Sequence, residues 1–134
     1  MNQTLEIIHD RRSTRAFLKK PLEQDTIDQI LEAAIRSPTA GNMMLYSILQ
    51  ITDPELKQKL VTTCDHQPFI AKAPLVLLFL ADYQRWFDYF LASDVPAYCD
   101  RHHLKMRLPA EGDLMLACCD ALIAAQTSVI AAES

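Results

Sequence analysis

The chain has 134 residues, of which 50% are hydrophobic and 22% charged, and its formal net charge is −4 at pH 7. This length and composition predict one globular domain with a core of its own and exclude a disordered chain. The acidic balance also disfavours nucleic acid as a partner, because proteins that bind phosphate backbones usually carry an excess of Lys and Arg.

The N-terminal segment predicts a short helix. Thr4 is a suitable N-cap for a helix that runs to about Arg11. The residues after Met1 are polar and then charged, and they contain no apolar run of the kind found in secretory signals. We therefore expect a cytoplasmic protein.

A cationic segment follows this helix. Guanidinium groups, together with the hydroxyls of Ser13 and Thr14, are the donors that grip phosphate oxygens. Because the positive charge is local in an acidic chain, the segment indicates a small anion as its partner. A turn that only faces solvent is the alternative. Five of the chain's 13 basic residues fall in this run: Arg11, Arg12, Arg15, Lys19 and Lys20.

Glycine is scarce, since the chain has only two, Gly41 and Gly112. An average protein of this size carries about nine. Phosphate loops of the Walker or GxGxxG type need several glycines at fixed spacing, so both types are excluded. A bound phosphate would have to be held by side chains, which favours the arginine segment.

The next part of the chain predicts a helix and then a strand. Apolar residues recur at three and four positions from Ile27 to Ile35, which indicates a helix with one buried face. Ser37 and Pro38 end this helix. Residues 45–52 are a short stretch that contains several β-forming residues and predict a strand.

A second helix and a second strand are expected after this. Asp53, followed by a proline and an acid, is a strong start signal for a helix that runs to about residue 63. Residues 75–80 are continuously apolar, which predicts a central strand covered on both faces. Asp82 is placed to cap an aromatic-rich helix, and residues 93–109 predict loop and broken helix.

A helix is predicted from about Glu111 to Ser134, and its apolar residues cover almost the whole circumference. Its length also fits a membrane span, but Asp120 near the centre costs about 2.5 to 3.5 kcal/mol on insertion scales. Asp113 and the lack of a flanking basic cluster argue against insertion as well. We therefore predict a helix buried in a core or in a homodimer interface, with no membrane partner.

The four cysteines are expected to be reduced packing residues, because no export signal precedes them and two of them are adjacent. Cys99, His102 and His103 lie close together and could begin a metal site. No second ligand pair at a familiar spacing completes it. We therefore predict a surface loop there and no metal.

The C-terminal helix lacks the usual stop signals. Its last turn has no Lys or Arg, and no glycine or proline follows. Few segments are available to flank the apolar strand at 75–80. We therefore expect residues 1–134 to be the N-terminal part of a longer single domain, with the C-terminal part absent from this chain.

Three stretches resemble the FMN-dependent nitroreductase family in order and spacing. The resemblance covers essentially the whole chain, but only the first half of a typical member. It implies an α+β fold in which a sheet is flanked by helices and a long apolar helix lies at a dimer interface. Gln67 and Lys72-Ala73-Pro74 favour the oxygen-insensitive, NADPH-preferring branch. The three stretches are Arg11-Arg12-Ser13-Thr14-Arg15-Ala16-Phe17, Ala33-Ala34-Ile35-Arg36-Ser37-Pro38-Thr39-Ala40-Gly41-Asn42, and Ala121-Leu122-Ile123-Ala124-Ala125-Gln126 leading to Ala131-Ala132-Glu133-Ser134.

The resemblance also implies a cofactor site. Asn42 and Gln67 are the amides available to the pyrimidine edge of the flavin, although without the resemblance each would be an ordinary turn or loop residue. The resemblance implies neither a metal ligand nor a catalytic acid or base. In this family, residues that match Arg11, Arg12, Ser13 and Arg15 hold the phosphate and ribityl end of FMN. Residues that match Pro38, Thr39, Ala40, Gly41 and Asn42 line the isoalloxazine, commonly from the other subunit.

The implied activity is transfer of hydride from NAD(P)H through FMN to a nitroaromatic, quinone or similar acceptor. Another flavin reaction, such as flavin reduction or reductive dehalogenation, is an alternative, and so is a flavin-free binding protein. The chain departs from the common family pattern at Met43-Met44-Leu45-Tyr46, where many members carry a glutamine-proline-tryptophan-like run. This stretch borders the pocket, so the substrate stays open. Met43 and Met44 are equally suited to packing in a core.

Overall fold

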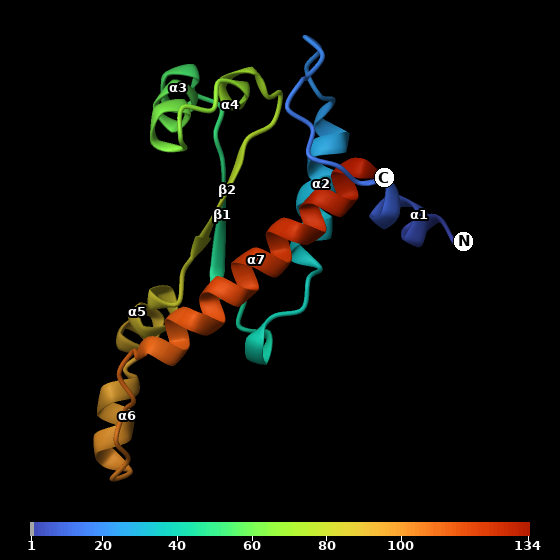
Figure 1. The fold of residues 1–134 in the computed structure, drawn as a ribbon. Helices are drawn as coiled ribbons and strands as arrows, with labels where there is room; N and C mark the ends of the chain where they lie inside the picture. Colours follow the sequence, from blue (N-terminus) through green and yellow to red (C-terminus); the bar gives the residue numbers. More distant parts are fainter. Residues whose placement is uncertain (1) are drawn as a thin grey trace.

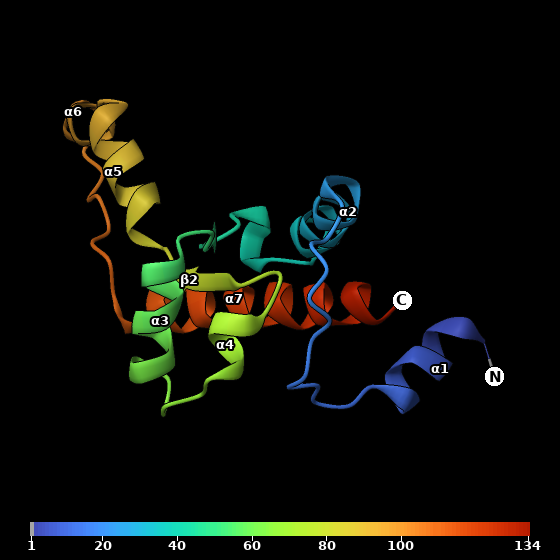
Figure 2. The ribbon, with the colours of Figure 1, turned by 90° about the horizontal axis from the view of Figure 1, so that it is seen from above.

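A long helix, α7 (Glu111–Glu133), organises the molecule. In the computed structural model, which describes residues 2–134, α7 runs through the middle and packs on α1, α2, η1 and both strands, whereas α3 and α4 pack on each other away from it (Figure 1). A view from above shows the same arrangement, with α1 beside the C-terminal end of α7 (Figure 2). The other elements are α1 (Gln3–Asp10), α2 (Gln24–Ile35), the 3-10 helix η1 (Ala40–Asn42), β1 (Tyr46–Gln50), α3 (Pro54–Thr63), α4 (Phe69–Lys72), β2 (Leu77–Ala81), α5 (Gln84–Ala92) and α6 (Val95–Arg101).

The sheet within residues 2–134 consists of β1 and β2, which pair antiparallel with Tyr46 opposite Ala81 and Gln50 opposite Leu77. Both predicted strands are therefore present. The prediction that the second is a central strand covered on both faces is not met in the described chain. β2 pairs with β1 alone there, and its side chains are only partly buried, because α7 covers one face.

The structure confirms one of the three predicted helix N-caps. Asp53 caps α3 as predicted, since its carboxylate accepts the N–H of Glu55 at 2.8 Å. The first helix starts earlier than predicted, because the Asn2 side chain, rather than Thr4, accepts the N–H of Leu5 at 3.0 Å. Asp82 does not cap α5.

Asp82 instead joins the two strands. Its carboxylate accepts a hydrogen bond from the Ser47 hydroxyl at 2.5 Å, and its N–H donates to the carbonyl of Leu45 at 2.8 Å. The carboxylate of Asp82 is therefore used between the strands and does not cap α5. This cross-strand use of Asp82 has no local sequence signal.

Small residues bring α2, β1 and α7 close together. Ala34 on α2 and Ala124 on α7 are fully buried, and Tyr46 of β1 packs against this part of α7. The Tyr46 hydroxyl donates to the carbonyl of Ala34 at 3.3 Å. Burial raises the pKa of Tyr46, and the negative charge of Asp120 raises it further. The ring is therefore held neutral in the core that supports the sheet.

Length and composition alone would allow α7 to cross a membrane, and it is the one helix of the described chain that meets this test. Its position favours the core-helix interpretation of the sequence. α7 packs on α2 and on both strands, and its Asp120 side chain is hydrogen-bonded to backbone amides of a neighbouring loop. A lipid environment would not supply those contacts.

An ion pair secures the start of α7. Both terminal guanidinium nitrogens of Arg107 donate to the carboxylate of Asp113, at 2.8 and 2.5 Å, and the N–H of Ala110 donates to the same carboxylate at 2.8 Å. The Arg107 hydrogen bonds hold the pKa of Asp113 below its ordinary value, with the Ala110 amide as the second cause. The ionised carboxylate is therefore the form that the fold favours.

We expect Arg107→Ala to lower the melting temperature at pH 7 and to have less effect in acid. Because the pKa of Asp113 is depressed in the folded state, the pair stabilises the fold above the ordinary carboxyl pKa of about 4 and stops doing so as the pH falls through the depressed value. Melting curves from pH 7 to pH 2 will show the difference between the two proteins closing. Arg101→Ala is the control, because its pair with Asp94 is exposed and 3.9 Å long. A constant difference at every pH would contradict this account.

Candidate functional site

The arginine segment lines a cavity of about 590 Å³ between the N-terminal chain and the end of α7. The guanidinium of Arg15 lies over the ring of Phe69, 5.8 Å from its centroid. The structure therefore brings the arginines and hydroxyls of the predicted segment together in one hollow, whereas Lys19 and Lys20 do not line it. The lining residues are Arg11, Arg12, Ser13, Thr14, Arg15 and Phe17 from the segment, Phe69 from α4, and Val129, Ala132 and Glu133 from α7.

The guanidinium and hydroxyl groups of this cavity make no hydrogen bond within the described chain, although the backbone N–H of Arg11 closes α1 on Ile7. Arg11, Arg12 and Arg15 form no ion pair with a carboxylate of residues 2–134, although Glu133 lies in the same wall. Residues 12–18 adopt no regular structure, and their amides donate to no backbone carbonyl of the described chain. Exposed, unpaired donors of this kind fit an anion better than a structural role.

The second predicted segment, Pro38 to Asn42, forms the turn at η1. Gly41 and Asn42 both have φ of 56°, a left-handed conformation that glycine and asparagine tolerate better than other residues. The Ser37 hydroxyl donates to the Thr127 hydroxyl at 2.8 Å, which ties the start of this turn to α7. The sequence Gly-Asn thus specifies the tight turn.

Asp120 holds this turn from the α7 side. Its side chain is only 2% exposed, and its two carboxylate oxygens accept the N–H groups of Ala40 at 2.9 Å and of Leu45 at 3.2 Å. Sequence reasoning treated Asp120 only as a cost for membrane insertion and missed this role. A single acid in the middle of an apolar helix was the available signal, because a buried charge needs partners.

Two side chains of α5 hold the same segment from the opposite side. The Trp86 indole N–H donates to the carbonyl of Met43 at 2.8 Å, and the Arg85 guanidinium donates to the carbonyl of Met44. The Thr39 hydroxyl accepts the N–H of Met44 at 3.2 Å. Residues 39–45 are therefore fixed between α7 and α5, which sequence reasoning also missed.

The two predicted segments do not share a cavity in one chain. The arginine cavity contacts α7 at Val129, Ala132 and Glu133, whereas Ala40 of the η1 turn contacts it at Asp120. Val129, the nearest of these cavity residues, is separated from Asp120 by about 13 Å along the helix axis, at 1.5 Å per residue. Gln67 lies in the turn between α3 and α4, half-buried, and lines neither region. One chain alone thus presents two separate parts of the predicted site.

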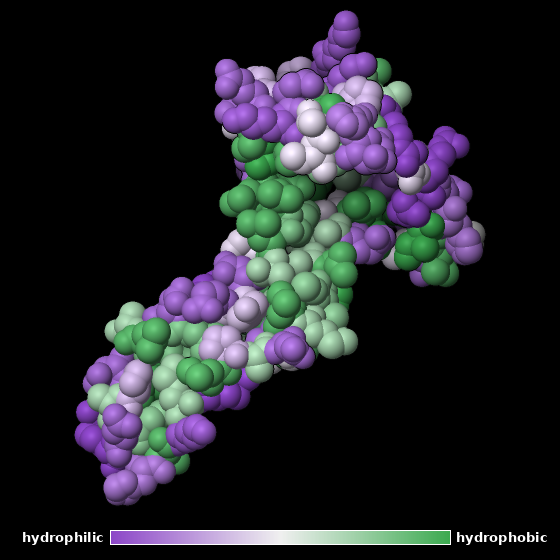
Figure 3. Space-filling view, turned by 60° about the vertical axis from the view of Figure 1, so that its left-hand side comes forward, coloured by the Kyte–Doolittle hydropathy of each residue, from purple (hydrophilic) through white to green (hydrophobic). Residues whose placement is uncertain are grey.

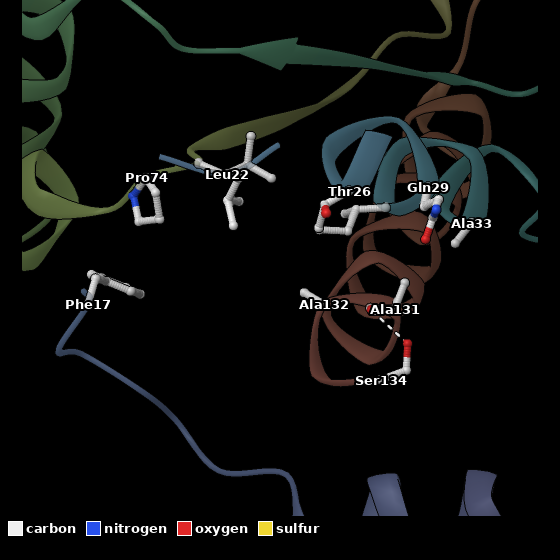
Figure 4. A pocket seen from close by; sticks show the side chains of 11 residues that line it. Phe17, Leu22, Thr26, Gln29, Ala33, Pro74, Ala131, Ala132 and Ser134 are labelled. Atoms are coloured by element: carbon white, nitrogen blue, oxygen red, sulfur yellow. Dashed lines mark hydrogen bonds between the residues drawn. The ribbon is translucent and has the colours of Figure 1, made fainter. Parts of the chain in front are cut away.

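A second cavity of about 590 Å³ adjoins the arginine cavity and has Phe17 and Ala132 in common with it (Figure 4). Figure 4 shows Phe17 and Pro74 on one side and the last turn of α7 on the other. None of its lining residues is charged. This second cavity therefore offers no charged side chain to an anion, unlike the arginine cavity.

The comparison with protein families decides what the chain is related to. The model of the family described as "Nitroreductase family" matches residues 8–134. The chain belongs to the nitroreductase family. Among curated proteins, this nitroreductase-family chain is 33% identical to "FMN reductase [NAD(P)H]" of Bacillus subtilis, covering 100% of the chain and 51% of that protein. It is also 33% identical to "FMN reductase (NADPH)" of the same organism, with the same coverage.

Solved structures with the same fold confirm the predicted α+β class. The hypothetical oxidoreductase YcnD from Bacillus subtilis superposes with a TM-score of 0.80 at 33% identity, covering 99% of this chain and 51% of the other. NADPH:FMN oxidoreductase from Vibrio harveyi, solved with NAD+, gives a TM-score of 0.80 at 26% identity, covering 98% and 52%. The nitroreductase-family chain thus spans about half the length of the relatives that it matches.

Proposed function

We propose that this chain belongs to an FMN-dependent NAD(P)H oxidoreductase that reduces nitroaromatic, quinone or similar acceptors. The observation that carries the proposal is the arginine cavity, where exposed guanidinium, hydroxyl and amide donors gather without partners in the described chain. The names of the Bacillus subtilis and Vibrio harveyi relatives support the choice of FMN and a nicotinamide nucleotide. A cytoplasmic location remains a prediction from the sequence.

The residues present fit FMN. Arg11, Arg12, Ser13 and Arg15 would hold the phosphate and ribityl end, because a dianionic phosphate needs several charge-assisted donors. The η1 turn would lie against the ring system, where Gly41 adds no side chain and Asn42 offers an amide. When bound, FMN supplies the hydride chemistry, and the protein supplies position and charge.

Two copies of the chain would complete the site. The arginine cavity and the η1 turn are separate in one chain, so a homodimer in which one copy's turn approaches the other's arginines would join them. The surface of α7 supports this arrangement, since Met115 and Leu122 are each 70% exposed. A broad band of apolar side chains also crosses the middle of the face drawn in Figure 3. A continuous exposed apolar surface of this kind is typical of an interface between protein chains.

We expect Leu122→Glu to weaken the dimer. The substitution places a charge in the centre of the apolar face of α7, where burial against a second copy would leave the carboxylate unpaired. Light scattering at micromolar concentration should show a dimer for the unmodified protein and a shift toward monomer for the variant. Leu91→Glu, on the exposed surface of α5, is the matched control. A stable monomer of the unmodified protein would overturn the dimer proposal.

The visible spectrum of the purified protein tests the proposed function as a whole. Bound flavin absorbs visible light, which the protein alone does not, and addition of NADPH under anaerobic conditions should bleach this absorption. Reoxidation by a nitroaromatic or a quinone would then identify the acceptor class. A colourless protein that takes up no FMN from solution would contradict the proposal and favour a flavin-free binding protein.

A further inference from the structure

A cavity of about 570 Å³ lies between the η1 turn and the first turns of α5. Its volume falls within the range of small-molecule sites, about 300 to 1,000 Å³. No function described above uses its α5 wall. The lining residues are Asn42, Met43, Met44, Arg85, Trp86 and Tyr89.

The walls of this cavity are fixed. Met44 has φ of 51°, a left-handed conformation that is uncommon for a residue with a long side chain. It is kept there by the hydrogen bond of its N–H to Thr39 and by the Arg85 guanidinium on its carbonyl. Residues held in sparsely populated conformations cluster at binding sites, where the surrounding structure enforces them.

The α5 wall is aromatic. The rings of Trp86 and Tyr89 are 5.9 Å apart and nearly perpendicular, at 87°, so they form a corner. A flat ring can stack on one of them and meet the other edge-on, which are the two preferred geometries of aromatic pairs. Tyr89 is 61% exposed, which leaves much of its ring accessible to a ligand.

The opposite wall and the rim add two further properties. Met43 and Met44 supply flexible thioethers, which make favourable contacts with aromatic rings and adjust to their shape. Arg85 is exposed and lies at the same cavity, so the guanidinium N–H groups that do not donate to Met44 are available to an anionic substituent. No lining residue carries a negative charge.

We propose that this cavity binds a planar, electron-poor aromatic molecule with one carboxylate or similar anionic group. The ring stacks in the corner of Trp86 and Tyr89, and the anionic group faces Arg85. The inference rests on the proposed function in one respect: because Asn42 belongs both to this cavity and to the segment assigned to the flavin, the bound molecule is the electron acceptor. It therefore narrows the acceptor class to aromatic acids.

The single tryptophan makes the test specific to the site. Trp86 is the only tryptophan of the chain, so its indole N–H gives one resonance in a proton–nitrogen NMR spectrum. Titration of the purified protein with 4-nitrobenzoate should shift this resonance to saturation. Nitrobenzene, which lacks the carboxylate, should bind more weakly. An indole resonance that does not respond to 4-nitrobenzoate would overturn the proposal.

Substitutions distinguish binding of 4-nitrobenzoate in the cavity from unspecific binding elsewhere on the protein. Tyr89→Ala should weaken 4-nitrobenzoate binding about two- to tenfold, the usual worth of one aromatic pair. Arg85→Gln keeps an N–H donor for Met44 and should remove the preference for 4-nitrobenzoate over nitrobenzene. Tyr98→Ala on α6, another exposed tyrosine outside the cavity, is the matched control and should bind as the unmodified protein does. Equal losses in the two tyrosine variants would contradict the assignment.

The same titration distinguishes an aromatic acid from other occupants of the cavity. It also separates a failure of this inference from a failure of the proposed function. Competitive displacement of 4-nitrobenzoate by FMN would assign the cavity to the flavin. An indole shift that depends on protein concentration would assign the cavity to a second copy of the chain. Either result overturns the inference. If the protein binds flavin but the indole resonance of Trp86 does not shift with aromatic acids, this inference is overturned and the proposed function is not. A flavin-free protein that still binds 4-nitrobenzoate through Tyr89 supports the cavity and contradicts the proposed oxidoreductase.

Discussion

Replacing Arg15 by alanine is expected to weaken FMN binding by one to two orders of magnitude. Arg12 and Arg15 flank Ser13 in the arginine cavity and have no carboxylate partner within the described chain. Loss of one charge-assisted hydrogen bond costs about 1.5 to 3 kcal/mol, and each 1.4 kcal/mol changes affinity tenfold. Titration of flavin-free protein with FMN measures the effect directly.

The control for this prediction is Arg101→Ala, which removes the same group from an exposed position on α6. Both variants remove one positive charge and make the net charge of −4 more negative by the same amount, so a general electrostatic effect would appear in both. Raising the salt concentration should weaken the contribution of Arg15, because salt screens charge pairs near the surface. Unchanged FMN affinity in Arg15→Ala would remove this residue from the phosphate site.

Replacing Asp120 by alanine is expected to lower the free energy of unfolding by about 2 to 4 kcal/mol. The substitution leaves the buried N–H of Leu45 and the partly buried N–H of Ala40 without their acceptor. An unsatisfied buried donor costs about 1 to 3 kcal/mol, and a partly exposed donor costs less because water can reach it. Asp120→Asn keeps one acceptor oxygen and should lose less. Chemical denaturation measures both, with the exposed Asp100→Ala as the control.

The same variant should also loosen the η1 turn in the folded protein. Trp86 donates to Met43, so release of residues 39–45 should shift or broaden the indole resonance of Trp86. A loss of stability without local release would leave the resonance of the folded protein unchanged. If Asp120→Ala unfolds like the unmodified protein and keeps its indole resonance, the carboxylate does not position the turn.

The sequence by itself determined most of the helices and one half of the candidate site. Start signals such as Asp53, and the uninterrupted apolar stretch of α7, act over a few neighbouring residues, so they can be identified without the fold. The cluster of Arg11, Arg12 and Arg15 is likewise local, because the three guanidiniums lie within five positions, although the hollow that they line is completed by α4 and α7. The resemblance to nitroreductases rested on such local segments and was confirmed by the family comparison.

Tertiary structure alone decided the contacts between distant residues. Asp120 meets Ala40 across 80 positions of sequence, and Trp86 meets Met43 across 43. Asp82, expected to cap a helix, accepts instead from Ser47 on the paired strand. A polar side chain in an apolar segment must find a partner, but its identity depends on which backbone groups the packing of α7, α5 and the sheet leaves unpaired. That choice is a property of the whole fold, so no local pattern records it.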